Sequence, residues 1–207
     1  MIAAGRGLIV QSMHPVRCKC GSVSGQIEGS GASVRVVCYC VDCRAFARYL
    51  GRNAEVLDAQ GGTEIVQVAQ SRLRFSRGME HLAAMRLSEK GMVRWYAACC
   101  KTPIGNTMAN PGISFVGMIH ASLDREQLDR DFGTAVAHVN TGSALGERTV
   151  KPRGLFSVMI RFVSIVVAAR LSGRWRESPF FNHSGSPIVR PVVLTPSELA
   201  TLHESAR

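Results

Sequence analysis

The sequence predicts a mainly β protein of the α+β class, with antiparallel sheets, one apolar helix near the C-terminus and an extended tail. Short runs of β-favouring residues are separated by glycine-rich turns such as GSGAS and QGG. Residues 155–169 form a longer, almost wholly apolar run, as expected of a helix. The 207 residues, 46% of them apolar and 19% charged, can bury one sizeable core, so we expect one globular domain with an appendage.

The strands that we expect fall in two groups separated by turns. The first group is VRCKCGSVSGQIEG, SVRVVCY, TEIVQVA and RLRF, and the second is HLAAMRLS, MVRWYAACC, ISFVGMIH and TAVAHVN. VDCRAFARYLG, between two strands of the first group, predicts a short helix with Cys43 in its first turn and close to Cys40. LDREQLDRDFG predicts a polar helical turn that ends at Gly133.

The chain divides into three parts by composition. Residues 1–13 are expected to be a loose N-terminal tail, residues 14–147 a β domain that contains all the cysteines, and residues 148–207 a basic C-terminal helix and tail. The first residues hold too short an apolar stretch for a membrane span and make a poor secretory signal. We therefore expect a cytoplasmic protein.

The C-terminal part has an unusual helix. Residues 148–176 contain seven basic residues and no acidic one, around an apolar run that Arg161 interrupts. Such a helix must bury most of its circumference, but the run is shorter than the roughly 20 residues of a membrane crossing. We expect docking and not spanning, on the protein's own β core, on a second subunit of a homo-oligomer, or on an anionic membrane surface. Further on, Thr195 and Glu198 predict a capped helix.

The net charge of +10 fits a solvated basic surface better than a nucleic-acid interface. No basic run is interleaved with aromatic residues and no helix-turn-helix pattern is present in the sequence. We do not expect a nucleic-acid partner.

The cysteines are the strongest chemical signal. One buried cysteine is usually a small hydrophobic residue, but an odd number in three tight clusters indicates metal binding in a reducing compartment and not disulfides. Zinc prefers thiolates in tetrahedral geometry, and three clusters predict one or two Zn²⁺ ions per chain. The predicted ligands are Cys18, Cys20, Cys38, Cys40, Cys43, Cys99 and Cys100.

The spacing within the clusters predicts two kinds of site. Cys18-x-Cys20 has the form of half a structural site, for which Cys99 and Cys100 provide the other half. Cys38-x-Cys40-x-x-Cys43 places three thiolates on one short segment and can leave the fourth position of the ion open, as catalysis requires.

Residues 17–107 resemble the glutathione-dependent formaldehyde-activating enzymes and their relatives, which include centromere protein V. The resemblance rests on CKCG at 18–21, CYCVDCR at 38–44, the GGTEI and LRF strands, and CCKTPIG at 99–105. It implies a zinc-containing β-tent fold and a carbon–sulfur lyase that adds glutathione to formaldehyde. It also implies that Cys18, Cys20 and Cys100 are structural ligands, and that Cys38, Cys40 and Cys43 are the catalytic ones.

The chain departs from the family pattern at two places. Tyr39 stands where the family usually has histidine, and alignment on Thr102 and Pro103 puts Lys101 at the glycine of C-x-x-C-G-T-P. Cys99 then has no counterpart. It either completes the structural set, which leaves the second site open, or closes the second site against substrate.

Two functions follow from these alternatives. The first is a zinc enzyme that binds glutathione or a similar thiol at Cys38, Cys40 and Cys43 and joins it to formaldehyde or another small electrophile. The second is a non-catalytic zinc module whose basic C-terminal segment contacts a protein or a membrane surface. Among other polar residues, His120 is a candidate proton carrier or ligand, and Arg44 and Asn106 are candidates for orienting ligands.

Overall fold

The structure is a computed structural model that describes residues 13–29, 31–147 and 149–206. The predicted N-terminal tail therefore lies outside the described residues except for Met13, which pairs with Glu28 as the first residue of a strand.

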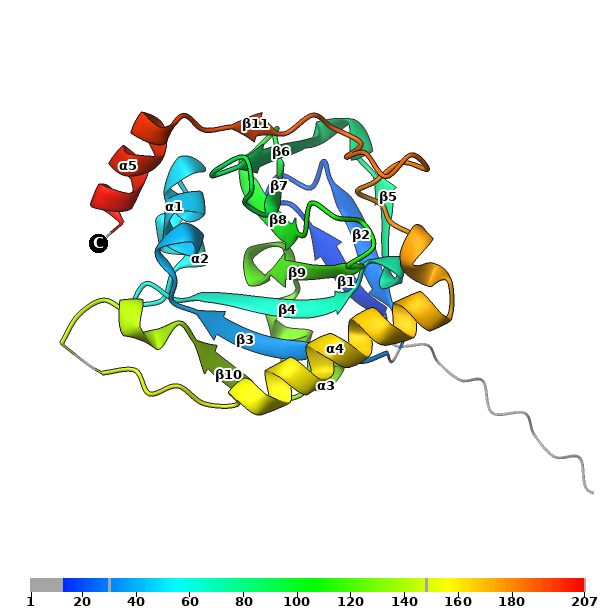
Figure 1. The fold of residues 1–207 in the computed structure, drawn as a ribbon, viewed down its shortest axis with the longest axis horizontal. Coiled ribbons are helices and arrows are strands. Elements are labelled where there is room, and N and C mark those ends of the chain that lie inside the picture. Colours follow the sequence, from blue (N-terminus) through cyan, green and yellow to red (C-terminus); the bar gives the residue numbers. More distant parts are fainter. Residues whose placement is uncertain (1–12, 30, 148, 207) are drawn as a thin grey trace, which may run out of the picture.

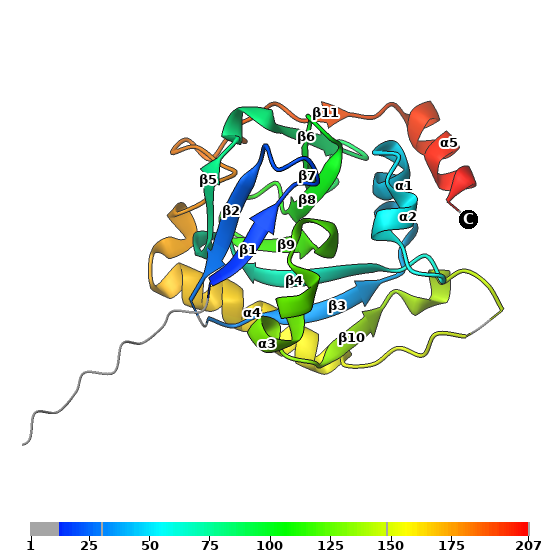
Figure 2. The ribbon, with the colours of Figure 1, turned by 180° about the vertical axis from the view of Figure 1, so that it is seen from behind.

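Two sheets make up most of the fold (Figures 1 and 2). The strands are β1 (Met13–Arg17), β2 (Ser24–Glu28), β3 (Val34–Cys38), β4 (Thr63–Ala69), β5 (Leu73–Arg77), β6 (Leu82–Arg86), β7 (Val93–Ala97), β8 (Thr102–Thr107), β9 (Phe115–Ile119), β10 (Val136–Val139) and β11 (Val192–Val193). A small sheet has the order β1-β2-β5, and a large one has the order β10-β3-β4-β9-β8-β7-β6-β11. Pairing is antiparallel except for β10 with β3 and β11 with β6. The prediction of a mainly β fold of the α+β class is confirmed.

Five α-helices in the described part of the chain accompany the sheets. They are α1 (Val41–Tyr49), α2 (Asn53–Val56), α3 (Leu128–Phe132), α4 (Leu155–Leu171) and α5 (Pro196–Ser205), with 3-10 turns at Gln70–Arg72, Met79–His81, His120–Ser122, Arg125–Gln127, Thr141–Ser143 and Arg174–Arg176. The predicted cap is present, since the Thr195 hydroxyl accepts from the Glu198 N–H while the Glu198 carboxylate accepts from the Thr195 N–H.

Both faces of the large sheet are used, because side chains alternate along each strand. In β4, Val66 and Val68 face the small sheet and belong to the main core with Trp95, while Ile65 belongs to a separate cluster on the opposite face. Figure 2 shows the small sheet in front of the large one. One face of the large sheet therefore builds the core, and the other is free to line a site.

Helix α4 packs on that second face and is covered on one side only (Figure 1). Ile165 and Ala169 are buried, and the Phe162 ring lies 4.8 Å from that of Phe115. Phe156 and Leu171, in contrast, are 80% and 86% exposed. The expectation that this helix buries most of its circumference is wrong within the chain itself, because the sheet reaches only one face. Among the described residues, no helix is long and apolar enough to cross a membrane.

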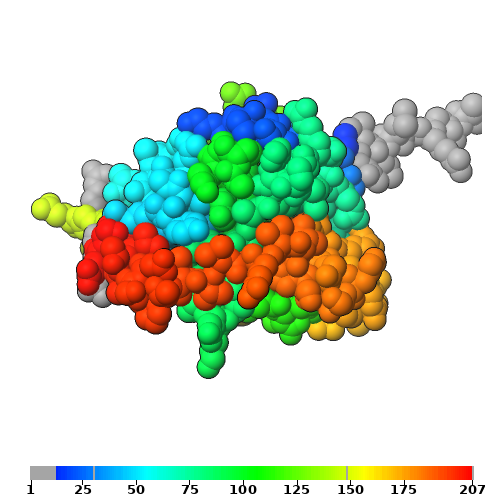
Figure 3. Space-filling view, turned by 90° about the horizontal axis from the view of Figure 1, so that it is seen from above, coloured from blue at the N-terminus to red at the C-terminus, as the bar shows by residue number. Residues whose placement is uncertain are grey.

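The segment after α4 runs over the surface to α5, as the orange-to-red path in Figure 3 shows. Phe180 and Phe181 leave this path and enter the main core, where the Phe180 ring lies 4.7 Å from Trp95. The tail therefore contributes two side chains to the core of the preceding part.

We predict that Phe180→Ala lowers the free energy of unfolding by about 3–5 kcal/mol, because it empties a fully buried site against Trp95. Phe156→Ala is the matched control and should change stability by less than about 0.5 kcal/mol. Urea denaturation measures both. Equal effects of the two variants would contradict the packing of the tail.

Candidate metal centres

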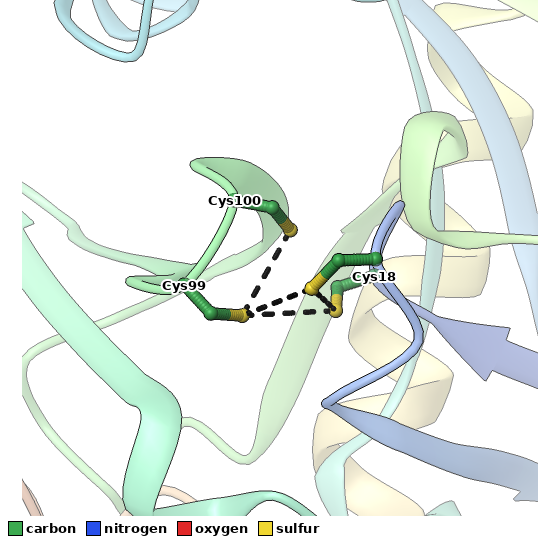
Figure 4. A group of neighbouring side chains, drawn as sticks. Cys18, Cys99 and Cys100 are labelled. Atoms are coloured by element: carbon green, nitrogen blue, oxygen red, sulfur yellow. Dashed lines mark hydrogen bonds between the residues drawn. The ribbon is translucent and has the colours of Figure 1, made fainter.

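Four cysteines from two distant turns converge on one point (Figure 4). Cys18 and Cys20 follow β1, and Cys99 and Cys100 lie in the turn between β7 and β8. The sulfur of Cys99 is 3.9 Å from that of Cys18, 3.4 Å from that of Cys20 and 3.9 Å from that of Cys100. Tetrahedral zinc with Zn–S bonds of about 2.3 Å needs sulfur atoms about 3.8 Å apart. The four thiols thus fit a tetrahedral metal ion, and we call them the four-cysteine group.

The turn that carries Cys99 and Cys100 differs from the prediction. We expected a strand through Cys100, but β7 ends at Ala97 and the Lys101 N–H donates to the Ala97 carbonyl at 2.8 Å. Lys101 has a φ of 57°, in the left-handed region that favours glycine. The bend lets two adjacent cysteines, which a straight strand would point to opposite faces, turn to the same point.

Hydrogen bonding prepares part of this group for ionisation. Ser22 bonds the Cys20 sulfur, through its side chain first and its backbone second, and lowers the pKa of Cys20 to about 6. Burial raises the pKa of Cys18. A metal ion would ionise such thiols outright, since a coordinating thiol loses its proton.

The other three cysteines form a second group at the junction of β3 and α1. Cys38 ends β3, Cys40 is the N-cap residue of α1, and Cys43 lies in the first turn of this helix. The sulfur atoms of the group lie within 4.8 Å of one another, and those of Cys38 and Cys40 are 3.4 Å apart. The prediction that Cys43 lies close to Cys40 on a short helix is confirmed. The amino end of α1 adds a positive potential that favours thiolates.

The electrostatics of this three-cysteine group single out Cys38. Hydrogen bonds from Cys40, then from Cys43, and also from the Asn140 amide, hold the pKa of Cys38 well below its usual range. The same contact with Cys38 raises the pKa of Cys40 and of Cys43. Asn140 Nδ2 lies 3.2 Å from the Cys38 sulfur, and the backbone of Asn140 has a φ of 54°. The sequence does not mark Asn140 as a site residue. Its only signal there is that asparagine, which tolerates left-handed backbone, stands at the end of a predicted strand.

The structure places Cys99 in the four-cysteine group and not in the three-cysteine group. In the part of the chain that the structure describes, no fourth histidine, cysteine, aspartate or glutamate joins Cys38, Cys40 and Cys43 within the same distance. Two cysteine groups that can hold a metal ion are therefore present, one with four thiols and one with three.

A cavity of about 360 Å³ opens on the three-cysteine group. Its floor is a row of side chains that face each other across four neighbouring strands: Gln67 on β4, Gly117 on β9, Asn106 on β8 and Arg94 on β7. A Cβ at Gly117 would lie 2.9 Å from Ile65, so glycine there leaves the space open. Phe162 of α4 is part of the wall. The cavity falls in the size range of sites for small molecules.

The buried end of this row is polar. Arg94 is 5% exposed, and its Nη1 donates to Asn106 Oδ1 at 3.4 Å. Its Nη2 lies 3.9 Å from Asp42. Arg94 Nε and Gln67 Oε1 are buried and have no hydrogen-bond partner in the described protein. Unpaired buried polar atoms are costly, and here they belong to two residues that line the cavity.

Other candidates lie outside the cavity. The Tyr39 hydroxyl donates to Asp58 at 3.3 Å, and burial, followed by the Asp58 charge, raises the pKa of Tyr39 to about 12. His120 is also buried elsewhere, with Nδ1 and Nε2 each 3.2 Å from a backbone carbonyl, and belongs to neither cysteine group.

Of the two predicted orienting residues, Asn106 lines the cavity and Arg44 fixes the loop that carries the ligands. The Arg44 guanidinium donates to the carbonyls of Tyr39 and Ser143, at 2.6 and 2.7 Å, and to that of Ala206. These bonds tie the three-cysteine segment to the C-terminal end of the chain.

Fold and sites together define a mainly β protein with two cysteine groups suited to metal ions. The chain belongs to the family described as "Family of unknown function (DUF6151)", which matches residues 10–190. A comparison with the curated proteins found no match. One similar solved structure is the crystal structure of a Rhodobacter sphaeroides protein, at 23% identity and a TM-score of 0.38, covering 59% of this chain and 97% of that one. A similarity at that level carries no argument about function.

We predict that Cys18→Ser/Cys99→Ser and Cys38→Ser/Cys43→Ser each lose one bound metal ion per chain and keep the other, because each double variant leaves too few thiols in one group and none of its changes touches the other. Elemental analysis of protein purified without chelators measures this, and the two variants serve as controls for each other. Loss of both ions from either variant, or of none from both, would contradict two independent sites.

We further predict that Lys101→Gly raises the free energy of unfolding by about 0.5–1 kcal/mol, because glycine relieves the left-handed backbone at a smaller entropic cost. Lys101→Ala keeps the strain and loses only the contact of Nζ with the Tyr96 ring, so it should not stabilise. Urea denaturation measures both. A less stable glycine variant would show that the ring contact outweighs the strain.

Proposed function

We propose that this protein is a zinc-dependent enzyme of the carbon–sulfur lyase type, which binds a small thiol such as glutathione at the three-cysteine group and adds it to formaldehyde or another small electrophile. The observation that carries the proposal is the membership of Cys99 in the four-cysteine group. Cys38, Cys40 and Cys43 then supply three ligands that face a cavity, and the fourth position is available to substrate. The four-cysteine group would hold a structural zinc.

The chemistry requires little beyond a thiolate and alignment. A zinc ion at the three thiolates would stabilise the substrate thiol in its ionised form at neutral pH. The thiol would give up its proton, its sulfur would attack the carbonyl carbon as the C=O π bond breaks, and the carbonyl oxygen would take up one proton in return, which gives a hemithioacetal. No oxidant or reductant is needed. The protein therefore has to position two small molecules, which the cavity favours.

The polar row gives the cavity a way to hold such a thiol. Both Arg94 and Gln67 line the cavity; a guanidinium suits a carboxylate, and a glutamine amide suits an amide or an ammonium group. Glutathione carries all three kinds of group. Asn140 keeps Cys38 oriented through its amide, and Arg44 holds the segment that the ligands share.

The seven unpaired cysteines suit a reducing environment, and we propose the cytoplasm as the location.

The test combines binding with turnover. We expect cobalt-substituted protein to change its visible spectrum on addition of glutathione, because a sulfur ligand enters the coordination of the three-cysteine site. Zinc-loaded protein should consume formaldehyde in a glutathione-dependent way, and Cys40→Ser should abolish both signals. Cys99→Ser is the control: it should keep the spectral change, since the four-cysteine group is separate.

A second function remains if the metal-loaded protein responds to no thiol. The chain is then a zinc-stabilised interaction module without catalysis. One observation favours this alternative, the exposed apolar face of α4.

A further inference from the structure

Helix α4 has two apolar faces, of which the protein covers one. The covered face consists of Val158, Phe162, Ile165 and Ala169, at steps of four, three and four residues. The uncovered face lies on the opposite side of the helix and has a similar spacing. It consists of Phe156, Ile160, Val163, Val167 and Leu171. Each of these five side chains is at least 47% exposed. Leu155 and Met159 extend this outer face and are also exposed.

The packing of α4 fixes how this outer face is presented. The inner face lies on β3, β4, β9 and β10, so the helix runs along the sheet and its outer face points away from the core (Figure 1). Arg161 Nη1 donates to the Ser33 carbonyl at 3.2 Å, and Arg170 Nε donates to the Gly112 carbonyl at 2.8 Å. The helix can therefore lie flat against a second surface without leaving the sheet.

The charge around the helix indicates which kind of surface the outer face can bind. The segment 148–176 carries seven basic residues and no acidic one. Among those that the structure describes, Arg174 is the only one in an ion pair, with Glu177. Lys151 and Arg153 before the helix, and Arg176 after it, keep their positive charge free of carboxylates. Trp175 lies between Arg170 and Arg176, with the guanidinium carbons 4.7 and 4.5 Å from its ring centre.

A hollow of about 570 Å³ lies beside the first half of the helix. Arg153, Ser157 and Arg161 line one side, and residues 133–137 line the other. Arg35 also lines it, but its charge is matched by Glu64 and Asp129. Two arginines and a hydroxyl next to an apolar helix face match a phosphate headgroup beside its acyl chains.

We propose that the outer face of α4 binds the surface of a lipid bilayer that contains anionic phospholipids. The apolar side chains enter the boundary between headgroups and acyl chains, and the flanking arginines and Lys151 contact the phosphates. A second copy of this chain fits less well, because an isologous contact would bring two uniformly basic helices together. Two copies of the basic segment would repel each other, whereas one copy complements an anionic surface.

The experiment is flotation of the zinc-loaded full chain with two kinds of vesicle, phosphatidylcholine alone and phosphatidylcholine mixed with phosphatidylglycerol. We expect binding to the mixed vesicles, weakened by salt, and little binding to phosphatidylcholine alone. The double variant Ile160→Asp/Val163→Asp should lose binding, because it places two carboxylates on the outer face. Arg153→Gln should lower the partition coefficient about fivefold.

Two control variants make the same kinds of substitution at other positions, so that an effect of position can be told from an effect of charge or hydropathy alone. Ile188→Asp alters an exposed apolar residue outside the helix, and Arg190→Gln removes an exposed positive charge outside the segment. Both should bind as the wild type does. Unchanged circular dichroism and metal content show that each variant folds.

Three outcomes would overturn the proposal. The first is no binding to the mixed vesicles at low salt, and the second is equal binding by Ile160→Asp/Val163→Asp and wild type. The third is a wild-type dimer that this double variant converts to a monomer, without vesicle binding, which assigns the face to a second copy. None of these outcomes bears on thiol binding at the three-cysteine group, so the two proposals fail independently.

Discussion

The bend between β7 and β8 decides which thiols form the four-cysteine group. Because Lys101 takes a left-handed conformation, Cys99 and Cys100 turn toward Cys18 and Cys20 together. If β7 continued straight, adjacent side chains would point to opposite faces, and one of the two thiols would be unavailable to the group. The three-thiol set depends on a second local feature, the junction at which β3 ends and α1 begins, and not on this bend.

The large sheet then gives the three-thiol set its surroundings. Antiparallel registry sets Gln67, Gly117, Asn106 and Arg94 side by side on the face opposite the core. Burying Arg94 is costly, and the partial pairing with Asn106 and Asp42 offsets this cost incompletely. A fold selected only for stability would fill such a row with apolar side chains. Its polarity next to the cysteines is therefore best explained by a ligand.

Local patterns in the sequence were sufficient for the elements that depend on neighbours in the chain. The helix that begins at Val41, the Thr195–Glu198 cap and most strands follow from periodicity and turn residues. The strand β8, formed by TPIGNT, was missed because proline and glycine argue against a strand, and its pairing with β7 and β9 overrides that preference. The partner of Cys99 and the contact of Asn140 with Cys38 required long-range geometry. Residues about 80 and 100 positions apart cannot be joined by local pattern alone.

Packing within the chain explains only part of the sequence of helix α4. The inner face needs Val158, Phe162, Ile165 and Ala169, and a helix with only this stripe would have a polar outer side. Instead the outer side repeats large apolar residues at a similar period, and these side chains are 47–86% exposed. Exposed contiguous apolar surface favours aggregation unless a partner covers it, and the proposed bilayer contact would cover it. The inner face of the same helix contributes Phe162 to the wall of the three-cysteine cavity. Helix α4 therefore serves the cavity with one face and leaves the other available to an external surface.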